Sequence, residues 1–218
     1  MPSADVPENP FRHLGEREQL DGGFFRFVTG TFVGPDGFTF EREIVRHPGA
    51  VCIVALEDDH RSVLMIRQYR AAVDVGLLEL PAGKRDVADE DPALCAGREL
   101  AEEIGREATS MTEVARFYNS PGFSDEETIC FLAEGLHEVP REAHGVEEEH
   151  IVIERIQLSA VEDLMASGDL VDAKSIIGLL AARSALGWVT RAPGVTPRSI
   201  PGVSVPAQAG VPLAGSGQ

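Results

Sequence analysis

Three glutamates share one face of a predicted helix near the middle of the chain. Glu99, Glu102 and Glu103 occupy positions i, i+3 and i+4 of the segment PALCAGRELAEEIG, so about 3.6 residues per turn bring them together. Like charges at these spacings repel, and the helix dipole disfavours anions near its C-terminal end. Hard divalent cations prefer carboxylate oxygens and would reverse that repulsion. The pattern indicates a metal site; the alternative is a solvated acidic face paired to Arg98 or Arg106.

Local signals fix the position of this helix. Asp91 is a suitable N-cap, Pro92 fits the first helical position, and Gly105 is placed for a C-terminal cap. The preceding segment LLELPAG, residues 77–83, has the pattern of a short strand that ends in a turn. A strand and a tight turn are therefore expected to lead into the acidic helix.

Further strands and two more helices are expected around this unit. Two β-rich runs around Pro35-Asp36-Gly37 predict a hairpin. The other expected strands cover residues 51–56, 62–69, 113–119, 128–136 and a segment after residue 150. An acidic loop, VEEEH, covers 146–150, and helices are expected near 159–167 and 173–186. Because strands and helices do not alternate strictly, the pattern predicts a mixed α/β layered fold.

The composition excludes several classes of protein. The 218 residues include 19 Lys and Arg against 36 Asp and Glu, a formal charge of −17, which argues against nucleic acid as a partner. A phosphate substrate would therefore require metal ions or a few local arginines. No apolar stretch approaches the roughly 20 residues of a membrane helix. Three dispersed cysteines and the lack of a secretory signal predict reduced thiols and a cytoplasmic location.

The acidic helix and the loop before it resemble the Nudix box, G-x5-E-x7-R-E-U-x-E-E-x-G-U, where U is a bulky aliphatic residue. Two positions depart from the pattern. Six residues instead of five separate Gly83 from Glu90, and Arg106 replaces the final aliphatic residue. A one-residue loop insertion is thermodynamically mild. The matching positions are Gly83, Glu90, Arg98, Glu99, Leu100, Glu102, Glu103 and Gly105.

The resemblance implies a fold and a set of metal ligands. The fold would be the Nudix fold, an α/β/α sandwich of mixed sheets, with an N-terminal β-rich segment that supports a homodimer. Glu99, Glu103 and the carbonyl of Ala82 would bind Mg²⁺, with Mn²⁺ possible, and Glu102 would bind directly or through water. Arg98 would orient the glutamates and Glu90 would brace the loop, while Gly83 and Gly105 would be structural.

The resemblance also implies an order of segments along the chain. Residues 1–20 would be a flexible N-terminus and 21–50 an N-terminal β-hairpin segment. The Nudix hydrolase domain would cover 51–190. Residues 191–218 are rich in Pro, Gly, Ser, Val and Ala without a period, and such a tail buries too little surface to offset its ordering entropy. We therefore expect 191–218 to be disordered.

Four features outside the box resemble the ADP-ribose pyrophosphatase branch of the family. They are LLELPAG, SPGFSDE (120–126) with Pro121 sixteen residues after Gly105, RQYR (67–70) and FEREIV (40–45), and the resemblance extends over about 22–187. In that branch the catalytic base is a Glu on a later loop, here VEEEH. Glu147 or Glu148 would be the base and Glu149 would contribute to metal binding. A solvated acidic loop is the alternative.

The same resemblance gives a set of substrate contacts. Arg42 and Arg70 would meet diphosphate oxygens, for which a guanidinium fork is well suited, although either could be an ordinary strand-edge arginine. Phe24 and Phe25 would stack on adenine, with one of them packing in the core instead. The full set expected to bind substrate is Phe24, Phe25, Arg42, Arg70, Lys84, Ser120, Pro121, Gly122 and Asp125, the last four beside the terminal ribose.

The reaction implied by the resemblance is Mg²⁺-dependent hydrolysis of the diphosphate of ADP-ribose to AMP and ribose 5-phosphate. One alternative is hydrolysis of another nucleoside diphosphate sugar or of a dinucleotide. A second is a regulatory module that binds ADP-ribose without cleaving it, although a complete glutamate set speaks against a pure sensor. An RNA-processing role is disfavoured by the charge of −17.

Overall fold

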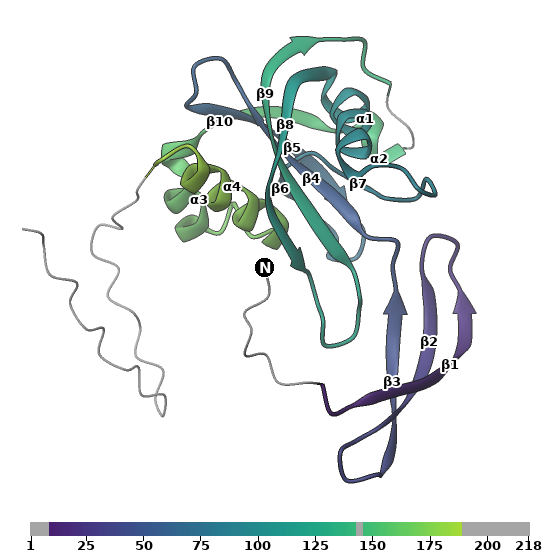
Figure 1. Ribbon diagram of the computed structural model, residues 1–218. Coiled ribbons are helices and arrows are strands. Elements are labelled where there is room, and N and C mark those ends of the chain that lie inside the picture. The colour runs from purple at the N-terminus through teal and green to yellow at the C-terminus, as the bar shows by residue number, and fades with distance from the viewer. Residues whose placement is uncertain (1–8, 143–145, 189–218) are drawn as a thin grey trace, which may run out of the picture. The chain divides into compact units, whose positions relative to one another are not determined.

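The computed structural model describes residues 9–142 and 146–188, so the predicted tail over 191–218 lies outside the described residues. The N-terminal part is a three-stranded antiparallel sheet in the order β1-β2-β3 (Figure 1). Strands β2 (Arg26–Val33) and β3 (Thr39–Arg46) form the predicted hairpin. Gly37 lies in its turn with a φ of 82°, a conformation that glycine adopts without strain.

Strand β1 (Arg12–Asp21) corrects the expectation of a flexible N-terminus over 1–20 from residue 12 onward, while residues 1–8 lie outside the described residues. It pairs with β2 from Arg12 opposite Val33 to Asp21 opposite Arg26. Every residue of β1 is exposed, so its sequence carries no alternation of apolar and polar positions. Backbone hydrogen bonds to β2 form this strand, and a hydrophobic pattern could not have revealed it.

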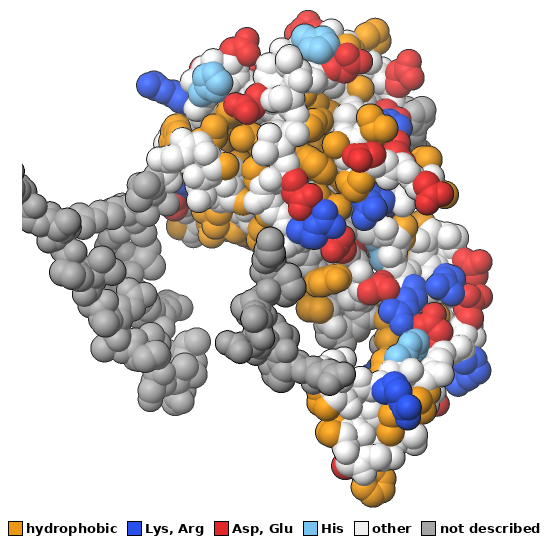
Figure 2. All heavy atoms as spheres, in the orientation of Figure 1, with side chains coloured by type: hydrophobic (Ala, Val, Ile, Leu, Met, Phe, Trp, Pro, Cys, Tyr) orange, Lys and Arg blue, Asp and Glu red, His pale blue; other side chains and the backbone are white. Residues whose placement is uncertain are grey.

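Charges of both signs cover the three-stranded sheet. Arg46 pairs with Glu16 at 2.7 Å, and Arg26 lies 3.5 Å from Glu18. In the space-filling view, blue and red side chains gather over this part of the molecule (Figure 2). The first pair joins β3 to β1 and the second joins β2 to β1. Both are at least partly exposed, so each contributes little to stability.

The second sheet is mixed and has the order β10-β5-β4-β9-β8, with β6 paired to β5 and β7 to β4. Strands β4 and β5 pair at Ala55–Leu64 and Leu56–Val63; further along, β5 pairs with β6 and β4 with β7. The strands are β4 (Ala50–Leu56), β5 (Ser62–Arg70), β6 (Val75–Glu79), β7 (Ala82–Lys84), β8 (Arg106–Tyr118), β9 (Glu127–Glu138) and β10 (Val152–Gln157). The segment predicted as a short strand ending in a turn over 77–83 contains the end of β6 and most of β7, which Leu80 and Pro81 separate.

Helix α1 (Pro92–Ile104) has the predicted ends. The Asp91 side chain accepts a hydrogen bond from Ala93 N at 2.8 Å, and Gly105 closes the helix with a φ of 64°. The VEEEH segment, expected as a loop, contains the short helix α2 (Val146–Glu149). Four residues are too few to show a helical period in the sequence. The remaining helical elements are the 3-10 turn η1 (Leu158–Ala160), α3 (Val161–Ser167) and α4 (Ala173–Ala185).

Two hydrophobic cores lie on opposite faces of the second sheet, and β4 contributes to both. Val51, Ile53 and Ala55 pack in the core that contains the buried side chains of α1. Cys52, Val54 and Leu56 pack in the core that contains Leu179 and Ala182 of α4. Residues of a strand point alternately to opposite faces, which explains this division. The predicted α/β/α sandwich is confirmed (Figure 1).

The cysteines agree with the prediction of reduced thiols. Cys52, Cys95 and Cys130 are all buried and free. Across the described ranges, no helix combines the length and apolarity that crossing a membrane requires.

Candidate active site

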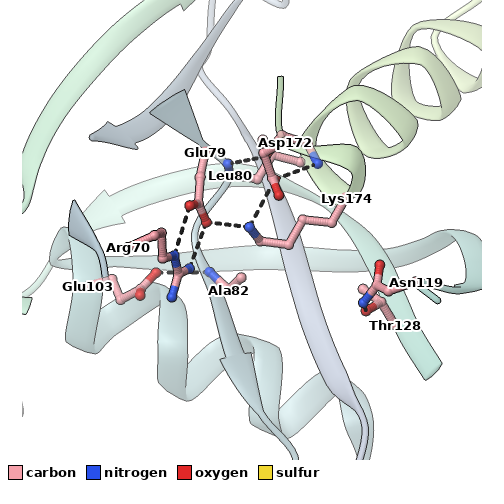
Figure 3. Close-up of polar contacts among 10 residues, drawn as sticks. Arg70, Glu79, Leu80, Ala82, Glu103, Asn119, Thr128, Asp172 and Lys174 are labelled. Atoms are coloured by element: carbon pink, nitrogen blue, oxygen red, sulfur yellow. Dashed lines mark hydrogen bonds and ion pairs between the residues drawn. The ribbon is translucent and has the colours of Figure 1, made fainter. Parts of the chain in front are cut away.

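The acidic face of α1 lies beside the start of β7. Glu103 is 3% exposed, and its Oε2 accepts a hydrogen bond from the backbone N of Ala82 at 2.9 Å (Figure 3). Glu99 is also buried. Buried carboxylates are unusual unless they are paired or bind a cation. The structure therefore places two of the predicted metal ligands in the interior, next to the predicted carbonyl ligand Ala82.

Arg98 connects the acidic side chains of the helix to the loop before it. Its Nη1 donates to Glu99 Oε1 at 2.8 Å and to Glu102 Oε2 at 3.0 Å. Its Nη2 lies 3.6 Å from Glu90 Oε2. One guanidinium thus contacts two glutamates of the helix and lies near Glu90 of the loop; the roles that the resemblance implies for Arg98 and Glu90 stay predictions.

Gly83 leaves the space that the carboxylate of Glu99 occupies. A Cβ at residue 83 would lie 1.9 Å from Glu99 Cδ, closer than nonbonded atoms can approach. Gly83 is therefore required by close packing and not by backbone conformation. Gly105, in contrast, has left-handed dihedral angles, and its N–H bonds to carbonyls at the end of α1.

Helix α2 brings a further carboxylate to the cluster. Of the three candidate residues, Glu148 is half-buried, and its charge acts on both Glu99 and Glu103. Glu147 and Glu149 are exposed, and the charge of Glu147 acts on Tyr69. Arg141 donates a hydrogen bond to the carbonyl of Glu148 and so ties α2 to the loop after β9. Among Glu147, Glu148 and Glu149, Glu148 is thus the one whose charge acts on the glutamates of α1.

Burial and mutual repulsion perturb the acidic cluster. Burial, reinforced by the charges of Glu99 and Glu148, raises the pKa of Glu103 to about 8, although the Ala82 N–H and Arg70 oppose the shift. Burial also raises the pKa of Glu99; Arg98 opposes this, and Glu102 and Glu148 add to it. Strongly perturbed acids that lie together are typical of functional sites.

The donor set fits a hard divalent cation by its chemistry. All side-chain donors are carboxylate oxygens, the backbone N of Ala82 bonds to one of them, and the absence of a Cβ at Gly83 makes room for the Glu99 carboxylate. Within residues 9–142 and 146–188, no three His, Cys, Asp or Glu side chains are gathered closely enough to form a metal-binding group. The cluster therefore supplies oxygen ligands and negative charge that a cation would bring together.

Arg70 lies close enough to Glu103 for its charge to act on that carboxyl, and it binds a second buried glutamate. Its Nε and Nη2 donate to the two carboxylate oxygens of Glu79 at 2.8 and 2.6 Å (Figure 3). Glu79 is 1% exposed and also accepts from Lys174. The sequence analysis missed Glu79 and Lys174. The available signal was a charged residue inside the apolar run LLELP, because a glutamate buried in a strand needs a positive partner.

Two aromatic residues predicted to bind substrate lie just before β2. Phe24 is 49% exposed, with Lys84 Nζ 4.7 Å from its ring centroid and His47 5.7 Å away in an edge contact. The ring of Phe25 lies over Gly22, where a Cβ would be 2.6 Å from it. The structure thus joins Phe24 to Lys84 at the end of β7, while Phe25 packs against its own chain.

The remaining predicted residues gather where β3 meets the 120–125 loop. Arg42, Pro121, Gly122 and Asp125 line a cavity of about 260 Å³. Both oxygens of Asp125 are engaged, by Arg46 Nη1 at 3.0 Å and by His47 N at 2.9 Å, so Asp125 fixes the loop to β3. The Ser120 carbonyl accepts from the N–H groups of residues 123 and 124 and closes the loop. Substrate binding by these residues stays a prediction.

Comparison with known proteins agrees with this geometry. The model of the NUDIX domain matches residues 46–177. An ADP-ribose pyrophosphatase of Mycobacterium tuberculosis (strain ATCC 25618 / H37Rv) is 37% identical over 180 residues, covering 82% of this chain and 86% of the relative. One from Bacillus subtilis (strain 168) is 38% identical over 141 residues, covering 65% and 75%. A crystal structure described as an ADP compounds hydrolase has a TM-score of 0.71 at 24% identity, covering 83% and 98%.

The chain belongs to the Nudix family, as the match to the domain over residues 46–177 shows. It is a Nudix pyrophosphohydrolase, related over most of its length to ADP-ribose pyrophosphatases. The predicted family and Nudix fold are therefore confirmed. Enzymes of this family generally need divalent cations, in keeping with the acidic face of α1.

Proposed function

We propose that the enzyme hydrolyses the diphosphate of ADP-ribose to AMP and ribose 5-phosphate in the presence of Mg²⁺. The observation that carries this proposal is the cluster of the buried Glu99 and Glu103 with the half-buried Glu148 near Arg70, in which the pKa of Glu103 is raised to about 8. The similarity to two ADP-ribose pyrophosphatases over 82% and 65% of the chain supports the choice of substrate.

The residues proposed to hold the cation are Glu99, Glu102, Glu103, Glu149 and the carbonyl of Ala82. When bound, Mg²⁺, or Mn²⁺ in its place, neutralises diphosphate charge, polarises the P–O bond and lowers the pKa of an attacking water. Arg98 holds Glu99 and Glu102 in position through bonds of 2.8 and 3.0 Å, and the Ala82 N–H holds Glu103. These contacts restrict the ligands before substrate arrives, which reduces the cost of ordering them.

Glu148 is the residue we propose as the general base. It is half-buried and close enough to Glu99 and Glu103 for its charge to act on both, so a water bound at the cluster would lie within its reach. Its carboxylate would take the proton of that water as the new P–O bond forms and the P–O bond to the bridging oxygen breaks, so that the other phosphate leaves with that oxygen. Glu147 is the alternative, although it is exposed and its charge acts on Tyr69.

Arg70 and Arg42 are proposed to bind the diphosphate, and Phe24 with Lys84 the adenosine end of the substrate. The cavity between Arg42 and the 120–125 loop would take the terminal ribose. Aromatic rings such as the exposed Phe24 offer a face on which a base stacks.

The three-stranded sheet is proposed to form a homodimer.

The test is a hydrolysis panel with Mg²⁺, with Mn²⁺ and with EDTA. It contains ADP-ribose, several sugar nucleotides, NADH, FAD and a capped RNA, with the products resolved by chromatography. The proposal predicts AMP and ribose 5-phosphate, with ADP-ribose ahead in kcat/KM and no turnover in EDTA. If another diphosphate leads, the assigned substrate is wrong while the metal chemistry stands. Tight ADP-ribose binding without turnover would indicate a regulatory module and contradict the proposed reaction.

A further inference from the structure

We propose that Lys174 is a positioning residue that acts on the diphosphate through Glu79 and Arg70. The inference rests on the proposed contact between Arg70 and the substrate diphosphate. Lys174 lies in the first turn of α4, more than 100 residues along the chain from Arg70, and no feature of the Nudix box points to it.

Glu79 is the centre of the arrangement. Its carboxylate is 1% exposed and is shared between two cations, Arg70 of β5 and Lys174 of α4 (Figure 3). Arg70 binds it with two parallel N–H groups, at 2.8 and 2.6 Å, and Lys174 Nζ donates to Glu79 Oε2. Two-point binding fixes the plane of the guanidinium as well as its position.

Lys174 is itself held by the N-terminal turn of α4. Its Nζ donates to Asp172 Oδ2 at 2.9 Å. Asp172 is the N-cap of the helix and also accepts from Ser175 N at 3.0 Å and Ser175 Oγ at 2.5 Å. Ser175 Oγ accepts from the N–H of Leu80, the residue after Glu79, at 2.7 Å. Helix α4 therefore holds both the carboxylate of Glu79 and the backbone that carries it.

This arrangement leaves part of Arg70 available. The Arg70 side chain is 40% exposed, and its Nη1 has no hydrogen-bond partner among the described residues. Arg70 also lies close enough to Glu103 for its charge to act on that carboxyl, which places it at the edge of the acidic cluster. Because Lys174 supplies a second positive charge to Glu79, Arg70 is not the sole counterion of a buried carboxylate. The Nη1 group of Arg70 and part of its positive charge can therefore interact with an anion.

A purely structural network would look similar, so the test must separate the two roles. A structural role predicts that removing Lys174 lowers the Tm and lowers activity by the same factor whether or not Arg70 is present. A positioning role predicts that the effect depends on Arg70. Residues that act through one another are non-additive, and a double-mutant cycle measures that coupling.

The experiment measures the Kd of ADP in Mg²⁺ by calorimetry, and KM and kcat with the best substrate of the panel. For Lys174→Gln we expect Kd and KM to rise about tenfold while kcat changes less than about threefold, since ground-state binding of the diphosphate is affected. Lys174→Arg should keep Kd within about threefold because the charge is retained. In the Arg70→Ala background, Lys174→Gln should change Kd by less than about twofold.

The matched control is Glu162→Gln, which removes a different ion pair of α4. Arg183 Nη1 donates to Glu162 Oε2 at 2.6 Å and joins α4 to α3. This variant should lower the Tm and leave the Kd of ADP unchanged. An unchanged Kd in Lys174→Gln, or an equal rise with and without Arg70, would overturn the proposal. If Lys174→Gln does not fold, Asp172→Asn gives the same test, because its amide oxygen can still cap α4 while its charge no longer holds Lys174.

Because ADP binding needs no turnover, this test is separate from the test of the reaction. Failure of the wild-type enzyme to hydrolyse ADP-ribose would contradict the proposed function. The double-mutant cycle on ADP binding could still be interpreted. Failure of the cycle with normal ADP-ribose hydrolysis would contradict only the role of Lys174.

Discussion

Glu79 and Glu103 are two buried glutamates on either side of Arg70, and the chain surrounds them differently. Glu79 has two cations in direct contact. Burial would raise the pKa of Glu79, but Arg70 and Lys174 outweigh it and the net shift is downward. Glu103 accepts one backbone N–H bond and lies near two other carboxylates, and its pKa is raised to about 8.

The difference separates a buried charge that is balanced within the chain from one that is not. A buried carboxylate whose counterions belong to the same chain needs no cation from solvent to balance its charge. A buried carboxylate among like charges carries an electrostatic cost that a bound cation would remove. We assign to catalysis the buried residues whose charge destabilises the protein in the absence of a ligand.

The largest expected effect is that of Glu103→Gln on turnover. We expect kcat to fall more than about 100-fold, since a metal ligand is lost, while the circular dichroism spectrum is unchanged. The Tm in EDTA should not fall, because a neutral amide is cheaper to bury than a carboxylate. Glu107→Gln, on an exposed part of β8, is the control. Near-normal turnover in Glu103→Gln would remove the proposed metal role.

Glu79→Gln should lower stability and, because Glu79 links Lys174 to Arg70, should also weaken ADP binding. Losing the shared carboxylate leaves the half-buried Lys174 near Arg70 with like charge, and we expect a loss of about 2–4 kcal/mol in the free energy of unfolding. Urea denaturation measures it. Glu154→Gln removes a more exposed partner of Arg67 and should cost less than about 1 kcal/mol. Equal losses in the two variants would show that burial of Glu79 is not what sets its importance.

Gly83→Ala tests whether space for Glu99 is needed. The new Cβ would lie 1.9 Å from Glu99 Cδ, so the carboxylate must move, and we expect kcat/KM to fall about tenfold. In the same region, Gly97→Ala meets no atom within 4 Å and should stabilise α1 by about 0.5–1 kcal/mol without loss of activity. Unaltered kinetics in Gly83→Ala would show that the position of Glu99 is not critical.

The smallest effect is a pH dependence of the metal-free protein. A raised pKa of about 8 in Glu103 means that its contribution to stability is fully present below the unfolded pKa near 4.5 and is lost as pH rises toward 8. Glu79, with a lowered pKa, contributes above 4.5 and loses its contribution as pH falls. In EDTA, the Tm should therefore fall by a few degrees from pH 5.5 to 8, and by less in Glu103→Gln. Identical slopes would contradict the assignment.

Local signals made the acidic helix predictable. Asp91, Pro92 and Gly105 each act within one turn of the residues they stabilise, so the ends of α1 follow from the sequence. The acidic residues follow from spacing on that helix. The choice between Glu147 and Glu148 did not, because it depends on how α2 is turned toward α1.

Long-range partners were the part that sequence could not supply. Strand β1 is exposed along its whole length and forms by pairing with β2, so it shows no apolar period. The contact of Lys174 with Glu79 joins residues 95 positions apart, and only the packing of α4 against the sheet brings them together. The single charged residue in the apolar run LLELP, Glu79, indicates that a positive partner is needed but does not indicate which residue supplies it.

The most direct test of the account is the proton balance of Mg²⁺ binding. Calorimetric titration at pH 7 in two buffers of different ionisation enthalpy measures protons released per cation bound. With a Glu103 pKa of about 8, cation binding should displace about one proton in the wild-type enzyme and none in Glu103→Gln, whose affinity for Mg²⁺ should also fall. Mg²⁺ binding without proton release, or with equal affinity in Glu103→Gln, would contradict the claim that this buried glutamate binds the metal.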